Sequence, residues 1–284
     1  MGEDFVRSEP NSAKIIRDLS KLDFLVCQDI FMSETAKLAH VVLPAACFAE
    51  KDGTFTNTER RVQRVRRAVA PAGEARADWQ IVCDVATAMG YPMSYSHPSE
   101  IWDELAALSP LFAGISYPRI EEQGIQWPCP DKTHPGTPYL HVKKFTRGLG
   151  LFHVIKFRPP AEVPDEKYPM ILSTGRTLYN YNIGNMTRKT ASIEQKQPEN
   201  FVEIHLDDAS RLGIGNGDMV RVTTRRGSIV VSAVVASKVR PGVLWMPFHY
   251  VEAPTNLLTN DAFDTVTRTA EYKACAAAIE RAAP

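Results

Sequence analysis

The sequence predicts two kinds of architecture, an α/β layer at the amino end and a small all-β domain at the carboxyl end. Helical and strand-like apolar patterns alternate over the first 45 residues, whereas short strands with turn residues follow from about residue 170. Between them, prolines and glycines are dense over 110–165, which is typical of a connector. Short strands at this spacing form either a sandwich or a small barrel.

The amino-terminal layer is expected to be a β-α-β unit. Asn11 is a suitable cap for a helix over 12–22, and residues 24–27 and 41–43 have the apolar character of buried strands. In open α/β sheets ligands bind beyond the carboxyl ends of strands, which makes Gln28, Asp29 and Ser33 a candidate site for a nucleotide or a sugar. The alternative is an ordinary turn and helix cap, because no glycine-rich phosphate loop accompanies these residues.

The next region is predicted to contain packing helices over 79–89 and 98–108, where apolar residues recur at helical spacing. Before them lies a basic run with arginines at positions 60, 61, 64, 66 and 67. The whole chain carries 33 basic and 33 acidic residues, and the run has no interleaved aromatics. We therefore expect these arginines to pair with carboxylates or a bound anion, and we predict no nucleic-acid partner.

Composition also bears on location and metal binding. No apolar run approaches the roughly 20 residues that span a bilayer, and the amino-terminal stretch MGEDFVRSEP lacks the apolar centre of a signal peptide. We expect a soluble cytoplasmic protein with no membrane partner. The five cysteines form no C-x-x-C pair and the seven histidines show no ligand spacing, so no metal site is predicted within the chain.

Five strands are predicted in the carboxyl-terminal part, over 170–173, 219–223, 228–235, 243–248 and 275–279. The first of them leads into a long polar loop, RTLYNYNIGNMTRKT, at 176–190. Thr174, Gly175 and Arg176 stand at the strand end, where a glycine permits close approach of a ligand and a guanidinium can bind phosphate. Tyrosine faces, asparagine amides and a second basic group suit a large phosphorylated heterocycle. The alternative is an exposed polar loop without a ligand.

Longer stretches of the sequence carry a resemblance in one continuous order. They are QDIF from 28, HVVLPAACFAEKDGTFTNTERRVQRVRRAV from 40, STGRTLYNYNIGNMTRK from 173, PFHYVEAPTNLLT from 247 and AEYKACA from 270. Together they resemble the carboxyl-terminal part of molybdopterin-dinucleotide oxidoreductases, the dimethyl sulfoxide reductase superfamily. Within that superfamily the sequence is most similar to the catalytic (alpha) subunit of molybdenum- or tungsten-dependent formate dehydrogenase.

The resemblance implies a division into three parts. Residues 1–45 would be the end of a Rossmann-like cofactor domain and 46–155 a helical and loop-rich connector region. Residues 156–284 would form a six-stranded β-barrel that binds molybdopterin dinucleotide. The implied fold is therefore a partial Rossmann-like α/β layer, a helical and loop region, and a barrel.

The implied cofactor is bis-molybdopterin guanine dinucleotide, with molybdenum or tungsten held by an upstream part of the enzyme. The resemblance places Gln28, Asp29 and Ser33 near the guanine nucleotide. It places a larger set against pterin and phosphate, namely Thr174, Gly175, Arg176, Tyr179, Gly184, Asn185, Met186, Thr187 and Arg188. Asn256, Tyr272 and Lys273, with His249, would complete the cap. No catalytic residue is expected in this chain.

The implied activity is oxidation of formate to carbon dioxide, with electrons passing through iron–sulfur clusters to a flavin-bearing, NAD-linked partner. The expected partners are the upstream half of the catalytic subunit and the iron–sulfur and flavin subunits. The family's cluster cysteines and metal ligand do not occur in this sequence, so we expect a truncated or split half that is inactive alone. Two alternatives are the same region of a related reductase such as nitrate reductase, and a non-catalytic remnant that acts as an interaction module.

Overall fold

The structure, a computed structural model, describes residues 1–282. The chain divides into two compact units. The first comprises residues 1–27, 31–42 and those from 156 onward, and the second comprises 28–30 and 43–155. The three-part division drawn from the resemblance remains a proposal about domains.

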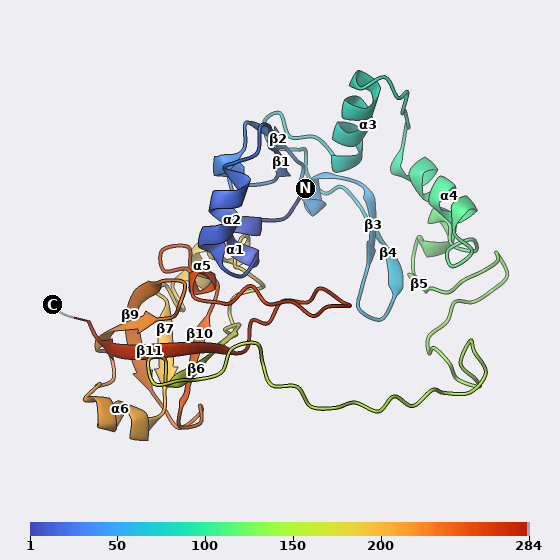
Figure 1. Ribbon diagram of the computed structural model, residues 1–284. Coiled ribbons are helices and arrows are strands. Elements are labelled where there is room, and N and C mark those ends of the chain that lie inside the picture. The colour runs from blue at the N-terminus through green and yellow to red at the C-terminus, as the bar shows by residue number, and fades with distance from the viewer. Residues whose placement is uncertain (283–284) are drawn as a thin grey trace. The chain divides into compact units, whose positions relative to one another are not determined.

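A closed barrel forms the larger part of the first unit, at the yellow-to-red end of the chain in Figure 1. Its strands are β6 (Met170–Gly175), β7 (Phe201–Ile204), β8 (Met219–Thr223), β9 (Ser228–Val235), β10 (Val243–Pro247) and β11 (Cys275–Arg281). They run in the order β10-β6-β11-β8-β9-β7, with β10 on β6 and β7 on β9 parallel and the other pairs antiparallel. The all-β domain is thus a barrel, and the six strands that the resemblance implied are confirmed.

Alternate residues of β6, β8 and β9 point into the barrel interior. Along β6, Met170, Leu172 and Thr174 are buried while the residues between them are less buried. The same period of two places Val220 and Val222 of β8 in the core. Each large apolar side chain removed from water in this way stabilises the fold by about 1.5–3 kcal/mol. Closure also leaves no unpaired strand edge along the wall.

Two α-helices lie in the barrel region, α5 (Ala191–Glu194) and α6 (Leu206–Leu212), and α6 ends at Gly213. Gly213 has a φ of 65°, the left-handed conformation that commonly terminates a helix. The Asp208 carboxylate is buried at this end of the barrel and accepts a hydrogen bond from the Gly242 amide at 2.6 Å. It thereby connects α6 to the turn that precedes β10.

The amino-terminal part of the first unit contains α1 (Phe5–Ser8), α2 (Ser12–Leu19) and the 3-10 turn η1 (Ala36–Leu38). Asn11 precedes α2 but has a φ of 52° and makes no side-chain cap bond, so the predicted capping role is wrong. Strands β1 (Val26–Asp29) and β2 (Val41–Pro44) pair with each other. β1 begins two residues later than predicted, and the helix expected between these strands is only the η1 turn.

The second unit has a three-stranded sheet of β3 (Gly53–Thr56), β4 (Arg61–Val65) and β5 (Ile125–Gln126). Its helices are α3 (Asp78–Ala88), α4 (Pro98–Leu108) and the 3-10 turn η3 (Tyr117–Ile120). Arg64 and Arg66 each pair with Glu121 at 2.7 Å. The predicted pairing of the basic run with carboxylates is therefore confirmed for these two arginines.

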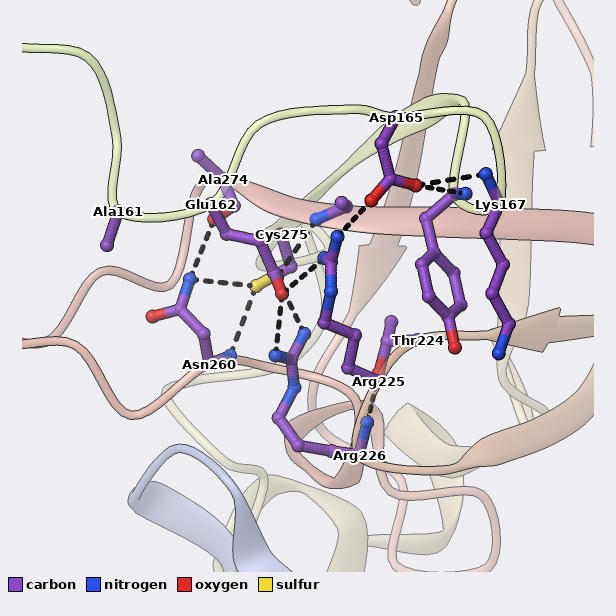
Figure 2. Close-up of polar contacts among 12 residues, drawn as sticks. Ala161, Glu162, Asp165, Lys167, Thr224, Arg225, Arg226, Asn260, Ala274 and Cys275 are labelled. Atoms are coloured by element: carbon purple, nitrogen blue, oxygen red, sulfur yellow. Dashed lines mark hydrogen bonds and ion pairs between the residues drawn. The ribbon is translucent and has the colours of Figure 1, made fainter.

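A short segment before β6 is fastened to the barrel by charge (Figure 2). The Glu162 carboxylate accepts hydrogen bonds from Arg225 at 2.6 Å, from Arg226 at 2.8 Å and from the Ala276 amide at 3.0 Å. Burial alone would raise the pKa of Glu162, but the hydrogen bonds from Arg226 and Arg225 outweigh it and lower that pKa. An open hollow of about 600 Å³ lies beside this cluster. Its charged groups are already paired with one another, so we do not assign it a ligand.

No helix within residues 1–282 combines the length and the apolar character needed to cross a bilayer.

Candidate functional site

The polar loop at 176–190, here called the lip loop, follows β6 and is held in shape by its own side chains. Asn180 is buried, and its Oδ1 accepts a hydrogen bond from the Thr187 hydroxyl at 3.0 Å. The same Thr187 oxygen accepts from the Tyr181 amide at 3.3 Å. Gly184 has a φ of 73°, and a Cβ there would lie 2.9 Å from Arg188 Cγ. The loop shape therefore depends on Gly184 and on a small hydrogen-bond network.

His249 connects the lip loop to a second loop, residues 248–260 after β10, here called the cap loop. The imidazole is fully buried. Its Nε2 accepts a hydrogen bond from the Thr177 amide at 2.9 Å, so Nδ1 carries the proton and donates to the Asn182 carbonyl at 2.5 Å. Burial and, to a smaller extent, the neighbouring arginines lower the pKa of His249 to about 4, although the Asn182 hydrogen bond acts to raise it. His249 is therefore neutral at pH 7 and serves as a link between the loops.

Arg188 of the lip loop is held by two carboxylates. Its guanidinium donates to Glu194 through Nε at 3.0 Å and to Glu252 of the cap loop through Nη1 at 2.8 Å. It also lies over the Tyr250 ring, 4.7 Å from the centroid. Burial alone would lower the pKa of Arg188, but these carboxylates raise it. The charge of Arg188 is thus balanced within the protein and fixes the two loops together.

Arg7 of α1 reaches the same place from the far end of the sequence. Its Nη1 donates to Asn185 Oδ1 at 2.6 Å, and its Nη2 donates to the carbonyls of Ile183 and His249. Burial lowers the pKa of Arg7, against the attraction of Asp4. Within residues 1–282 no carboxylate lies at ion-pair distance from this guanidinium. Sequence reasoning missed Arg7, because no local pattern connects it with a loop 178 positions away.

A second group of predicted residues converges on the end of α1. Asn256 Nδ2 donates to the Arg7 carbonyl at 2.7 Å, and the Tyr272 hydroxyl donates to the Ser8 carbonyl, also at 2.7 Å. The Ser8 hydroxyl is buried and has no hydrogen-bond partner among the described residues.

The chain around β11 is joined to the end of β6 by two more predicted residues. Thr174 Oγ1 donates to the Tyr272 carbonyl at 3.0 Å, while the Lys273 ammonium donates to the Thr174 carbonyl. Burial, and then the nearby Arg176, lower the pKa of Lys273. The start of β11, the cap loop and the lip loop therefore share α1 and β6 as common supports.

Three of the predicted ligand residues present much of their surface to solvent. Tyr179 and Met186 are 44% and 48% exposed. Arg176 donates to Asn182 Oδ1 at 2.8 Å, and its guanidinium lies 5.3 Å from the centre of the Phe248 ring. These side chains remain accessible to a ligand outside the loop.

Gly175 has a packing role of its own. A Cβ at this position would lie 2.4 Å from Trp245 Nε1 of β10, which is an impossible contact. The space at the end of β6 is therefore required by the indole, whether or not a ligand also approaches.

The remaining predicted residues, Gln28, Asp29 and Ser33, form hydrogen bonds with other groups of the chain. Gln28 and Asp29 belong to the second unit, where Gln28 Nε2 donates to Asp78 at 2.8 Å and Asp29 accepts from the Ile30 amide at 2.7 Å. Ser33 belongs to the first unit, and its Oγ accepts from the Ala36 amide at 3.4 Å. The bonds of Asp29 and Ser33 are those expected of turns and caps, whereas the Gln28 bond joins positions 50 apart. The role of these residues toward a nucleotide stays a prediction.

The donor set fits an anionic heterocyclic ligand. The two loops and their supports present the cations of Arg7, Arg176 and Lys273, an aromatic face at Tyr179, and the buried, unpartnered hydroxyl of Ser8. Cationic and amide donors recognise phosphate, and a ring face stacks on a heterocycle. In the described part of the chain, no three His, Cys, Asp or Glu residues are grouped as a metal site would require.

Comparison with known families identifies the kind of ligand that these donors suit. Residues 1–88 match the molybdopterin oxidoreductase family, and residues 170–276 match the molydopterin dinucleotide binding domain. The chain therefore contains a molybdopterin oxidoreductase segment and a molydopterin dinucleotide binding domain. The matches support the predicted cofactor, molybdopterin guanine dinucleotide with molybdenum or tungsten, and place its binding domain over the barrel and both loops.

Individual relatives cover nearly all of the chain. It is 48% identical to the F420-dependent formate dehydrogenase subunit alpha of Methanocaldococcus jannaschii, over 99% of this chain and 42% of the relative. It is 39% identical to a nitrate reductase of Symbiobacterium thermophilum, over 97% of this chain and 40% of that protein. The chain thus spans about two fifths of the length of the relatives it matches.

Among solved structures, acetylene hydratase from Pelobacter acetylenicus shares the fold with a TM-score of 0.71 and 18% identity, over 99% of this chain and 44% of that one.

Proposed function

We propose that this chain is the cofactor-capping part of a formate dehydrogenase catalytic subunit. It binds molybdopterin guanine dinucleotide through the lip loop, the cap loop and the start of β11. The oxidation of formate to carbon dioxide takes place at a metal that another part of the protein helps to hold. By itself the chain has no formate activity.

One observation carries the proposal. Residues expected to bind the dinucleotide, chosen from separated stretches of sequence, converge on α1 and the end of β6. Arg7 contacts the backbone of both loops, and Asn256 and Tyr272 donate to α1 carbonyls. A site assembled from fixed donors loses little conformational entropy when the ligand binds, which favours affinity.

The residues of this chain bind and orient, while the redox chemistry belongs to the cofactor. When bound, the metal–pterin group supplies the two-electron chemistry that no side chain provides. The exposed Arg176 and Tyr179 are placed to hold the phosphate and ring portions of such a ligand. Neutral His249 holds the two loops together through its hydrogen bonds and is not a proton donor to the ligand.

The electron acceptor follows from subunits that this chain does not contain. The resemblance favours iron–sulfur and flavin subunits linked to NAD. The name of the Methanocaldococcus jannaschii relative favours coenzyme F420. We propose formate oxidation with electrons leaving through iron–sulfur centres, and we treat NAD and F420 as the two acceptors to compare.

Two other functions each have an observation in their favour. A nitrate reductase is supported by the 39% identical relative named above. An interaction module is supported by the exposed apolar run over 149–157, in which Phe152 is 99% and Val154 93% exposed. Neither explains why the donors expected to bind a dinucleotide converge on one support.

A co-expression experiment tests the proposal. The chain would be produced with the upstream portion of a formate dehydrogenase alpha subunit, in a host that makes molybdopterin guanine dinucleotide. We expect formate-dependent reduction of benzyl viologen by the combined protein and none by the chain alone. Added acceptor subunits then identify NAD or F420. Nitrate reduction without formate oxidation, or formate turnover by the isolated chain, would contradict the proposal.

A further inference from the structure

Arg7 is a partly buried cation whose hydrogen-bond partners are neutral. Its guanidinium is bonded to one amide oxygen and two backbone carbonyls, and no carboxylate of residues 1–282 is at ion-pair distance. The carboxylate that attracts Arg7 most strongly, Asp4, is hydrogen-bonded elsewhere, because its Oδ1 accepts from both the amide and the hydroxyl of Thr35. A buried charge without a partner is costly, so a bound anion would be stabilised here.

Arg188 provides the contrast inside the same network. It belongs to the lip loop itself, and Glu194 and Glu252 balance its charge. The two arginines share the His249 carbonyl as an acceptor. Arg188 therefore has carboxylates in direct contact, whereas Asp4, Glu34 and Glu252 attract Arg7 only from beyond ion-pair distance. In this sense the charge of Arg7 is unbalanced.

The contact with Asn185 determines which way that amide faces. An arginine has only donors, so the atom of Asn185 that meets Arg7 Nη1 at 2.6 Å must be the oxygen. The Asn185 Nδ2 group then points to the other side with two N–H donors, and it makes no hydrogen bond within the described residues. A free amide donor next to an unbalanced cation is suited to an anionic oxygen.

We propose that Arg7 and Asn185 form a phosphate-binding element for the pyrophosphate of the dinucleotide. Arg7 is a positioning residue: it turns the Asn185 amide so that both N–H groups donate to the phosphate, and it supplies the opposite charge. This inference rests on the proposed cofactor site. It adds that the pyrophosphate is the part of the ligand that contacts the lip loop. It also assigns a binding role to α1, outside the barrel.

The Asn185→Asp substitution separates this role from a structural one. A carboxylate keeps the oxygen that Arg7 needs and turns a neutral contact into an ion pair, so the ligand-free chain should become more stable. The same change replaces the amide donor with a negative oxygen that repels phosphate. We expect a higher midpoint of thermal unfolding together with a fall of about tenfold or more in affinity for inorganic pyrophosphate.

The measurements use the full chain. Sodium pyrophosphate is titrated by calorimetry, and pterin content is measured by fluorescence after oxidation of chain purified from a cofactor-producing host. Gln195→Glu is the control, since it makes the same amide-to-acid change at an exposed position close in sequence. It should leave both readouts unchanged. Arg7→Met should weaken pyrophosphate binding and also lower stability, because the Ile183 carbonyl loses its arginine donor and the His249 carbonyl keeps only the longer bond from Arg188.

Three results would overturn the inference: wild-type pyrophosphate affinity in Asn185→Asp, a parallel loss of stability and affinity in that variant, or no pyrophosphate binding by the wild-type chain. Failure of the proposed function looks different. In that case the wild-type chain binds pyrophosphate and Asn185→Asp does not, yet the combined protein fails to oxidise formate.

Discussion

The barrel wall and the two loops beside it are held together by different forces. The wall is a closed ladder of backbone hydrogen bonds around a core of alternate apolar residues. The lip and cap loops contain no strand, and their contacts run through His249, Arg188 and Arg7. The wall therefore provides stability for the first unit, while a few polar side chains determine the shape of the loops.

This difference predicts where substitutions act. Damage to the wall should unfold the unit, because its strands share one core. Damage to the loops should change ligand binding first, because few apolar contacts depend on them.

The largest expected effect comes from the wall. Leu172 of β6 is fully buried, so Leu172→Ala should lower the free energy of unfolding by about 2–5 kcal/mol through lost burial and a cavity. Denaturant unfolding followed by circular dichroism measures it. Val230→Ala on β9 is the control, since that side chain is 37% exposed and should change stability far less. Equal losses in the two variants would show that the barrel core does not carry the stability.

The next largest expected effect is a pH dependence of stability caused by His249, which links the two loops. Because the pKa of His249 is about 4 when folded and near 6.5 when unfolded, the unfolded chain binds the extra proton between those values. The contribution of neutral His249 to the free energy of unfolding is fully present above pH 6.5. It is lost as the pH falls toward 4, and the loss is on the order of 3 kcal/mol.

His249→Gln should flatten this part of the stability profile, measured by denaturant unfolding from pH 7 to pH 4. His153→Gln, at an exposed position, should leave the profile as in wild type. An unchanged slope in His249→Gln would mean that the buried imidazole does not link the loops.

A smaller effect is expected where wall and loop meet. Gly175→Ala brings a methyl group onto the Trp245 indole and should cost about 1–3 kcal/mol of stability. In a Trp245→Leu background the same change should cost much less, because the colliding ring is gone. A thermal-unfolding cycle of the four proteins measures the coupling. If the two changes add independently, the glycine is not required by the indole.

Much of the fold could be predicted from local pattern, and the exceptions have physical reasons. Five barrel strands follow apolar alternation between turn residues, and each is found close to its expected place. β7 is only four residues, FVEI, which is too short for apolar alternation alone to reveal it. The sixth strand came only from the resemblance. The predicted helix before β2 is a 3-10 turn, since its few residues cannot complete an α-helix.

The candidate site was predictable only in part. The lip loop is recognisable because its aromatics, amides and basic residues are concentrated in one stretch. Only the fold determines which of the two arginines has a carboxylate in contact. The sequence alone does not reveal that Glu252 pairs with Arg188, or that α1 places Arg7 beside Asn185 of the lip loop. The packing reason for Gly175 likewise depends on β10 lying beside β6.

Hydrogen exchange gives the most direct test of the central claim that the lip and cap loops hold the dinucleotide. The chain would be compared with and without bound molybdopterin guanine dinucleotide, using mass spectrometry of peptides across residues 1–282. We predict that bound cofactor slows amide exchange in 176–190, in 248–260 and in α1, while the barrel strands change little. Slowed exchange confined to other segments, with both loops unaffected, would contradict the account.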